Sequence, residues 1–270
     1  VPNLIGNIAD WEKIASFAKE NNLKVIEDSA DTLGYTYNSS FKDWSDVSTT
    51  SFYASHVVTG AGFGGIVSFR DIETFNYAKS LRSWGRRSAQ YEESEDFHRR
   101  FDCQIDGFDY DDKYVFDDIG YNFIPSEISA AFALIQMKNL NRNIQNRKDN
   151  FQYLENSFNN NDNFMTFINS NNSSSGWLAF PILLQNELKG KRKEFQIFLE
   201  KSGIQTRTIF TGNILRQPVA KKFNWDSFGD FKNCDEIMQN GILLGCHNQM
   251  SKEKMDYMLE KVFEAENCLK

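Results

Sequence analysis

The chain has 270 residues, of which 40% are apolar and 25% charged, and a formal net charge of −7. A chain of this size buries about three quarters of its unfolded surface, enough for one large domain or two smaller ones with a real core. The acidic balance argues against a general nucleic-acid-binding protein, which usually carries a basic face. No apolar run of about 18 residues occurs, so no membrane span is expected.

The first part of the chain alternates predicted helix and strand. Apolar residues at helical spacing predict a helix over residues 10–22, with Asp10 as its cap. The stretch LKVIEDSA (23–30) reads as a buried strand. Two more strands are predicted at VSTTSFY (47–53) and GGIVSF (64–69), and the next helix covers residues 71–84. A helix followed by a parallel strand is typical of an α/β fold.

The middle of the chain is less regular. Residues 88–118 are polar and aromatic with little periodicity, which predicts a long loop, either solvated or part of a binding site. A helix capped by Ser126 is predicted over residues 126–141, continuing after a bend as a polar helix over 143–158. The Asn- and Ser-rich stretch 159–176 reads as a loop around one short strand.

The remaining residues predict a smaller α/β domain. Strands over 177–184 and 204–210 alternate with helices over 192–201 and 252–268. We therefore expect a large domain over residues 1–142, and a linker helix with a small C-terminal domain over residues 143–270.

The four cysteines are widely spaced and form no CxxC pair. The sequence therefore predicts neither a metal site nor a disulfide framework, and reduced thiols in the cytoplasm are the default expectation.

The stretch SFYASHVVTGAGFGGIV (51–67) has the composition of a functional turn. A strand ending near His56 is followed by four glycines and then by a second strand, which predicts a hairpin-like excursion. The glycines either make the turn or allow close approach to a ligand. His56 is either a structural histidine or a catalyst. Glu27, Asp28 and Asp31 end an apolar strand, where open α/β sheets keep their ligand sites.

These stretches resemble the DegT/DnrJ/EryC1/StrS family of sugar aminotransferases, which use pyridoxal phosphate. The resemblance rests on VIEDSADTLG (25–34) and the stretch 51–67, and continues through SLRSWGRR (80–87), the segment 120–140 and TRTIFTGNILRQP (206–218). It implies a fold type I pyridoxal-phosphate-dependent transferase, with a mixed, mostly parallel sheet, flanking helices and a smaller C-terminal α/β domain. It also implies that the N-terminal part of the family pattern is missing from this chain.

One departure from that family decides the expected chemistry. Family aminotransferases hold the cofactor covalently through a lysine that stands where this chain has His56, and no lysine lies between Lys42 and Lys79. An imidazole cannot provide that tether, but it is well suited to proton transfer. A histidine here, together with Asp31 in EDxxDxLG, resembles the nucleotide-sugar 3-dehydratases of the family, acting on GDP-4-keto-6-deoxymannose or CDP-4-keto-6-deoxyglucose.

The resemblance implies roles for further residues. Asp28 matches the carboxylate that keeps the cofactor's pyridine nitrogen protonated, the alternative being an ordinary strand-end aspartate. Asp31 is expected near the cofactor ring, and Ser51 on its phosphate. Asn122 resembles an asparagine that reaches the phosphate from a neighbouring subunit, which implies a homodimer with shared sites.

Residues of the small domain resemble the substrate-facing segment of the family. Arg207, Asn213 and Arg216 are candidates to hold the nucleotide sugar, the alternative being ordinary surface residues. The CDP-sugar enzyme has an iron–sulfur cluster just after the WGR segment. This chain has Ser88 and Gln90 where thiols would be expected, so no cluster is expected and the GDP-sugar type is favoured.

The interpretation is therefore a pyridoxamine-phosphate-dependent 3-dehydratase, in which His56 removes a proton from the C4′ carbon of the cofactor so that the sugar's 3-hydroxyl leaves. Two alternatives stay open: a pyridoxal-phosphate-dependent sugar aminotransferase, and a non-catalytic homologue that binds a sugar nucleotide. The identity of the nucleotide and sugar, and any need for a reductase or for glutamate, are not encoded in these motifs.

Overall fold

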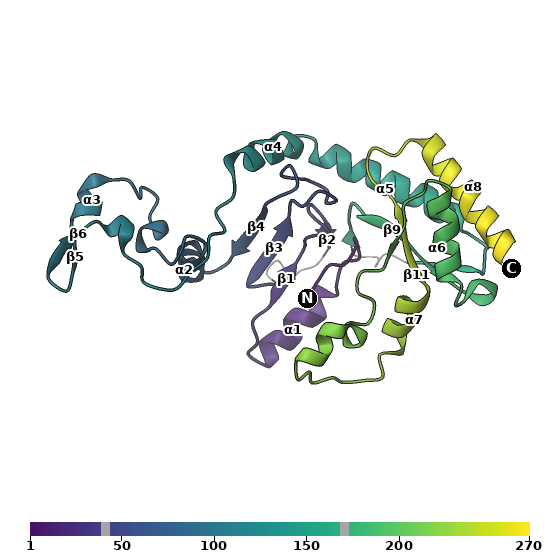
Figure 1. Ribbon diagram of the computed structural model, residues 1–270, viewed down its shortest axis with the longest axis horizontal. Coiled ribbons are helices and arrows are strands. Elements are labelled where there is room, and N and C mark those ends of the chain that lie inside the picture. The colour runs from purple at the N-terminus through teal and green to yellow at the C-terminus, as the bar shows by residue number, and fades with distance from the viewer. Residues whose placement is uncertain (39–43, 168–172) are drawn as a thin grey trace. The chain divides into compact units, whose positions relative to one another are not determined.

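The computed structural model describes residues 1–38, 44–167 and 173–270 (Figure 1). The chain forms two compact units. Unit 1 comprises residues 1–3, 9–30 and 39–138, and unit 2 comprises residues 4–8, 31–38 and 139–270. Two short N-terminal segments thus belong to unit 2, and the main division lies between Lys138 and Asn139, four residues before the boundary expected from the sequence.

Unit 1 is built on a three-stranded sheet in the order β1-β3-β4. Strand β1 (Ile26–Asp28) runs parallel to β3 (Val47–Ser51), which pairs antiparallel with β4 (Gly65–Phe69). Helix α1 (Trp11–Glu20) precedes β1, and the Asp10 carboxylate accepts from Lys13 N at its first turn. The hairpin expected around the glycine cluster is therefore confirmed as the β3–β4 connection, but its first strand ends at Ser51 and not near His56.

The rest of unit 1 consists of helices and one small hairpin. Helix α2 (Ile72–Arg82) follows β4, and helix α4 (Glu127–Met137) is capped by Ser126, as expected. Between them, residues 88–118 are not the featureless loop that low periodicity suggested. They contain the short helices η1 (Arg87–Gln90), α3 (Phe97–Phe101) and η2 (Asp112–Tyr114), with β5 (Cys103–Ile105) paired to β6 (Phe108–Tyr110).

Unit 2 contains a four-stranded antiparallel sheet in the order β10-β11-β9-β7. The strands are β7 (Phe164–Thr166), β9 (Ala179–Leu184), β10 (Arg207–Thr208) and β11 (Gly241–Gly245). The helices are α5 (Leu140–Ser157), α6 (Arg192–Lys201), α7 (Lys232–Asn240) and α8 (Lys252–Leu269), with shorter η3 (Asn186–Leu188), η4 (Ile214–Arg216) and η5 (Pro218–Lys222). Strands β2 (Thr36–Tyr37) and β8 (Ser173–Ser174) make a separate pair.

The core of unit 2 is dense and aromatic. Phe180, Ile182 and Leu184 of β9 and Phe195 of α6 are fully buried members of one apolar cluster. Helices α6 and α8 pack against one another there. The β-α-β-α order expected for this part lacked α7 and β11, and the strand expected over 204–210 is only two residues long.

The cause of that short strand lies at its two ends. Thr206 gives its N–H and hydroxyl to the Glu200 carboxylate, and Phe210 has a left-handed backbone with φ of 43°. Both features take the chain out of the sheet. No helix in the described residues is both long and apolar enough to cross a membrane.

Candidate active site

Asp28 lies at the carboxyl end of β1 with its side chain exposed. The carboxylate Oδ1 accepts from the backbone N–H of Ala30 at 3.1 Å and lies 3.5 Å from the Thr49 hydroxyl on β3. The parallel pairing of β1 and β3 sets Asp28 opposite Thr49, two residues before Ser51. Because Ser51 ends β3, the two candidate cofactor residues stand at the same edge of one sheet.

Ser51 and His56 are joined by the turn that follows β3. The ring nitrogen Nδ1 of His56 lies 3.2 Å from the carbonyl oxygen of Ser51. A carbonyl only accepts, so Nδ1 is the donor in this contact, and the tautomer with its hydrogen on Nδ1 has its lone pair on Nε2. The Ser51 hydroxyl oxygen accepts from Tyr53 N at 3.2 Å, which leaves its hydrogen to donate elsewhere. The half-buried imidazole is therefore held to the turn through Nδ1.

The glycines after His56 are explained by the turn itself. Phe52 N donates to the Gly64 carbonyl, and Gly60 N donates to the Phe52 carbonyl. A side chain at Gly60 would place its Cβ 2.1 Å from the carbonyl oxygen of Phe63, which no real Cβ tolerates. Of the two explanations open from the sequence, a tight turn accounts for this glycine without any ligand.

The segments SLRSWGRR and GYN meet through two glycines. A Cβ at Gly85 would lie 1.9 Å from the Asp118 carbonyl oxygen, and one at Gly120 would lie 2.2 Å from Gly85 N. The close approach allows Trp84 N to bond the Tyr121 carbonyl at 2.8 Å and sets Asn122 in a bridge with Ser83. Asn122 itself is exposed, so its amide is available to a ligand.

Asp31 differs from Asp28 although only three residues separate them. Asp31 is 7% exposed, and its Oδ2 accepts the backbone N–H of Ile5 at 2.8 Å within unit 2. This bond gives the carboxylate a structural partner. Its expected place near the cofactor ring stays a prediction.

The three candidate substrate residues of unit 2 are held in two different ways. Arg207 is exposed, and its guanidinium donates to the adjacent Thr206 carbonyl at 2.7 Å. Asn213 is 5% exposed and caps η4 by accepting from Leu215 N, while its amide donates to Asp235 at 2.7 Å.

Arg216 binds the same carboxylate as Asn213. Its Nε and one terminal nitrogen each donate to an oxygen of Asp235, which sequence reasoning did not single out. Arg216, and after it Asn213, lower the pKa of Asp235 to about 2. The structure thus brings Asn213 and Arg216 together around Asp235, and both have a structural use in addition to any substrate contact.

Arg86 is a further residue that sequence reasoning missed. Its guanidinium carbon lies 4.6 Å from the ring centre of Trp84 and within 6 Å of the rings of Tyr114 and Phe116. Its Nε is buried without a hydrogen-bond partner among the described residues. The sequence signal that could have identified Arg86 is the pair of arginines beside a tryptophan in WGRR. Cation–π contact of this kind orients a guanidinium without neutralising its charge.

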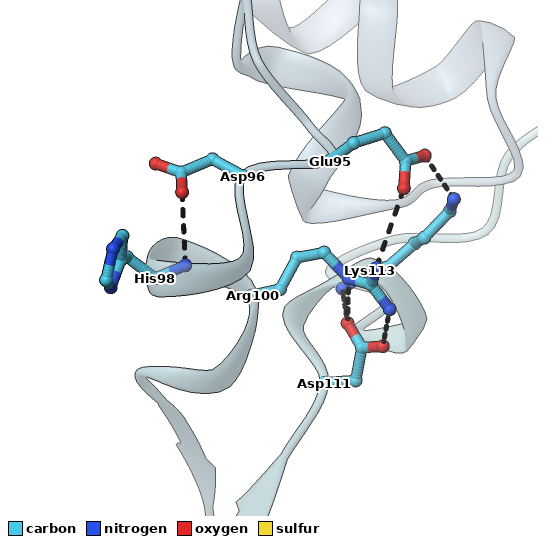
Figure 2. Close-up of polar contacts among 6 residues, drawn as sticks. All are labelled: Glu95, Asp96, His98, Arg100, Asp111 and Lys113. Atoms are coloured by element: carbon cyan, nitrogen blue, oxygen red, sulfur yellow. Dashed lines mark hydrogen bonds and ion pairs between the residues drawn. The ribbon is translucent and has the colours of Figure 1, made fainter.

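Residues 95–113 form an ion-paired cluster, shown in Figure 2. Arg100 donates through two nitrogens to both oxygens of Asp111, and Glu95 lies 3.6 Å from Arg100 and is paired with Lys113. Lys113 chiefly lowers the pKa of Glu95, as Arg100 lowers that of Asp111. The cluster fixes α3 against η2, and Lys113 is held by Glu95.

The donor set in unit 1 fits pyridoxal or pyridoxamine phosphate. An exposed strand-end carboxylate, a serine hydroxyl that donates to no acceptor among the described residues, and an imidazole bound through Nδ1 stand on two paired strands and the turn after them. These are the groups that a protonated pyridine nitrogen, a phosphate and a proton-transfer step require. Among the described residues no cluster of three or more His, Cys, Asp or Glu is arranged to hold a metal ion.

The fold is that of the pyridoxal-phosphate-dependent aminotransferases, a mixed α/β class. The crystal structure of Escherichia coli GDP-4-keto-6-deoxy-D-mannose-3-dehydratase with bound hydrated PLP superposes with a TM-score of 0.83 at 24% identity, over 97% of this chain and 66% of that one. Helicobacter pylori PseC, an aminotransferase involved in the biosynthesis of pseudoaminic acid, gives 0.81 at 22% identity, over 99% and 66% of the two chains.

The chain belongs to the DegT/DnrJ/EryC1/StrS aminotransferase family, whose sequence model matches residues 1–263. It is 30% identical to the lipopolysaccharide biosynthesis protein RfbH of Salmonella typhimurium, over 98% of this chain and 61% of the relative. It is 29% identical to the dTDP-4-dehydro-2,6-dideoxy-D-glucose 3-dehydratase of Saccharopolyspora spinosa, over 96% and 57%. The chain thus spans about three fifths of the length of these relatives.

Proposed function

We propose that the protein catalyses the 3-dehydration of a nucleotide-linked 4-keto-6-deoxyhexose with pyridoxamine phosphate as cofactor. The observation that carries the proposal is His56. It stands where the family's covalent lysine is expected, in a stretch of 36 residues (43–78) without any lysine. Its Nδ1 lies 3.2 Å from the Ser51 carbonyl oxygen, which supports the tautomer with a lone pair on Nε2, as a general base requires.

The cofactor, when bound, supplies an amine that condenses with the 4-keto group and a ring that accepts electrons. The chain's own residues hold it and move protons. Asp28 offers a carboxylate to the pyridine nitrogen, Ser51 donates its hydroxyl hydrogen to the phosphate, and Nε2 of His56 accepts a proton from the C4′ carbon. The imidazolium so formed is then able to protonate the departing 3-hydroxyl. No side chain is needed to anchor the cofactor covalently.

Arg86 supports a nucleotide-linked substrate. A guanidinium held on aromatic rings without a carboxylate partner in the described residues is suited to a diphosphate, and Tyr114 and Phe116 are about half exposed beside it. Replacing Arg86 with Leu should raise KM for the nucleotide sugar more than it lowers kcat. Arg70→Leu, a change of charge elsewhere in unit 1, serves as the control.

The proposal includes a homodimer with shared sites, to which Asn122 would contribute from the neighbouring subunit. Its side chain is exposed on a backbone that is fixed by the bridge to Ser83, which supports that role. Mixing Asp28→Asn with Asn122→Ala protein tests it, because a mixed dimer with shared sites regains one intact site while separate sites regain none.

The proposal favours the GDP-sugar type of substrate. Positions 88 and 90 hold no cysteine, and the product of the GDP-sugar type leaves without an iron–sulfur reduction.

The test is incubation of the protein with pyridoxamine phosphate and candidate 4-keto-6-deoxy sugar nucleotides, followed by mass analysis of the sugar. Loss of one water is the expected result. An aminotransferase would return a 4-amino sugar instead, and borohydride reduction with pyridoxal phosphate would then mark a lysine. Cofactor binding with an unchanged sugar mass for every substrate would indicate a non-catalytic homologue.

A further inference from the structure

Glu27 is a buried carboxylate that receives hydrogen bonds from three separate segments of unit 1. It is 4% exposed and points from β1 to the side opposite the exposed Asp28. Its Oε1 accepts from the Asn3 amide at 3.2 Å and from the Ser29 hydroxyl at 2.5 Å. Its Oε2 accepts from the indole N–H of Trp44 at 2.9 Å and from the Ser45 hydroxyl at 3.2 Å.

Both oxygens of Glu27 face a group that only donates. The indole N–H of Trp44 has no acceptor atom. The orientation of the Asn3 amide is fixed because its Oδ1 accepts the backbone N–H of Ala9 at 3.0 Å, so that its NH2 group faces Glu27. A glutamine at position 27 has only one oxygen, and an NH2 group takes the place of the other. Whichever way the amide is turned, its NH2 group therefore faces a second donor, either the Trp44 N–H or the Asn3 NH2 group.

This network is continuous with the backbone that carries Asp28. Asn3 N donates to the Asp28 carbonyl at 2.8 Å, and Asp28 N donates to the Val1 carbonyl at 2.9 Å. The side chain of Asn3 also donates to the Ser29 hydroxyl at 2.9 Å, so both residues next to Asp28 in sequence are joined to the same cluster. On the far side, Trp44 stacks on the fully buried Trp11 at 6.4 Å.

We propose that Glu27 is a positioning residue that sets the strand end from which Asp28 meets the cofactor's pyridine nitrogen. The inference rests on the proposed function, since Asp28 has that task only in a cofactor-binding protein. Glu27 touches neither substrate nor cofactor. It acts by holding Val1–Asn3, β1 and the Trp44–Ser45 segment in one register, because a carboxylate is the one side chain there that satisfies all four donors.

The experiment is a swap of carboxylate and amide. Glu27→Gln and Asn3→Asp are made singly and together, with Asp28→Asn as the benchmark. In the double variant the carboxylate introduced at position 3 accepts from Ala9 N and from the amide introduced at position 27. The oxygen of that amide accepts from Trp44, so that donors and acceptors match again. We measure the urea midpoint without cofactor, the dissociation constant of pyridoxamine phosphate, and the pH dependence of the absorption of the bound cofactor.

Glu27→Gln should weaken pyridoxamine phosphate binding about tenfold and shift the spectrum of the bound cofactor in the same direction as Asp28→Asn, and the double variant should recover to within about threefold, as expected for contacting residues. A lowered urea midpoint with unchanged affinity and spectrum would overturn the positioning role. Failure of the double variant to recover would also overturn it. If the unchanged protein binds neither form of the cofactor, the proposed function fails, and the role of Glu27 with it.

Discussion

The contact between Gly85 and the Asp118–Gly120 segment gives a prediction whose size follows from the structure. In Gly85→Ala the new Cβ would lie 1.9 Å from the Asp118 carbonyl oxygen and 2.6 Å from its carbon, and φ at this position is +80°. The left-handed backbone costs about 1–2 kcal/mol for an alanine. Overpacking against backbone adds about 1–3 kcal/mol. We therefore expect a loss of about 2–5 kcal/mol in the free energy of unfolding.

Gly107→Ala is the matched control. Gly107 has nearly the same φ, +85°, in the same unit, but a Cβ there has nothing within 4 Å. It should lose only the backbone part, about 1–2 kcal/mol. The assay is urea unfolding of both variants, followed by far-ultraviolet circular dichroism, with hydrogen exchange at Tyr121 N as a local readout. Equal midpoints for the two variants would refute the argument that close backbone approach requires glycine at position 85.

Three further predictions concern the site and its surroundings. His56→Lys should form a borohydride-reducible adduct with pyridoxal phosphate and abolish dehydration; retained dehydration would contradict His56 as the base. Asp235→Asn should destabilise unit 2 at neutral pH, because the folded pKa of about 2 lies below the unfolded value. The stabilisation by ionised Asp235 is present above its unfolded pKa and is lost as pH falls through about 2, so the two unfolding curves should converge in acid. Burial raises the pKa of Cys246 to about 12, so an aromatic disulfide reagent at about pH 8 should label exposed Cys268 first and Cys246 only on unfolding.

The elements with a strong local pattern were predictable from the sequence. The Asp10 and Ser126 caps, the β3–β4 hairpin around the glycines and β7 within 159–176 follow from turn chemistry and periodicity, whereas the second strand of that stretch, β8, was not expected. Elements held together by tertiary contacts were not predictable. Strand β11 is a five-residue apolar run whose pairing with β9 depends on residues about 60 positions earlier in the chain.

The segment 88–118 was also not predictable from local sequence, in this case because charged side chains order it. Its polar composition predicts a loop, because periodicity registers only apolar burial. Its order comes from Arg100 on Asp111 and Lys113 on Glu95, pairs that lie 11 and 18 residues apart. Ion pairs at such separations leave no trace in a local window, and for this reason the short helices and the β5–β6 hairpin were missed.

The motif EDSAD shows why a correct family resemblance does not fix the use of each residue. Four of its members lie in unit 1 and the last, Asp31, lies in unit 2. Glu27 is buried under four donors, Asp28 next to it is exposed, and Asp31 binds the backbone of Ile5. Strand alternation separates Glu27 from Asp28, since successive side chains point to opposite faces, and it makes one carboxylate a support and the next a candidate ligand. The boundary between the two units falls after Ala30 because segments 4–8 and 31–38 belong to the same compact unit as residues 139–270. The motif itself does not determine that boundary.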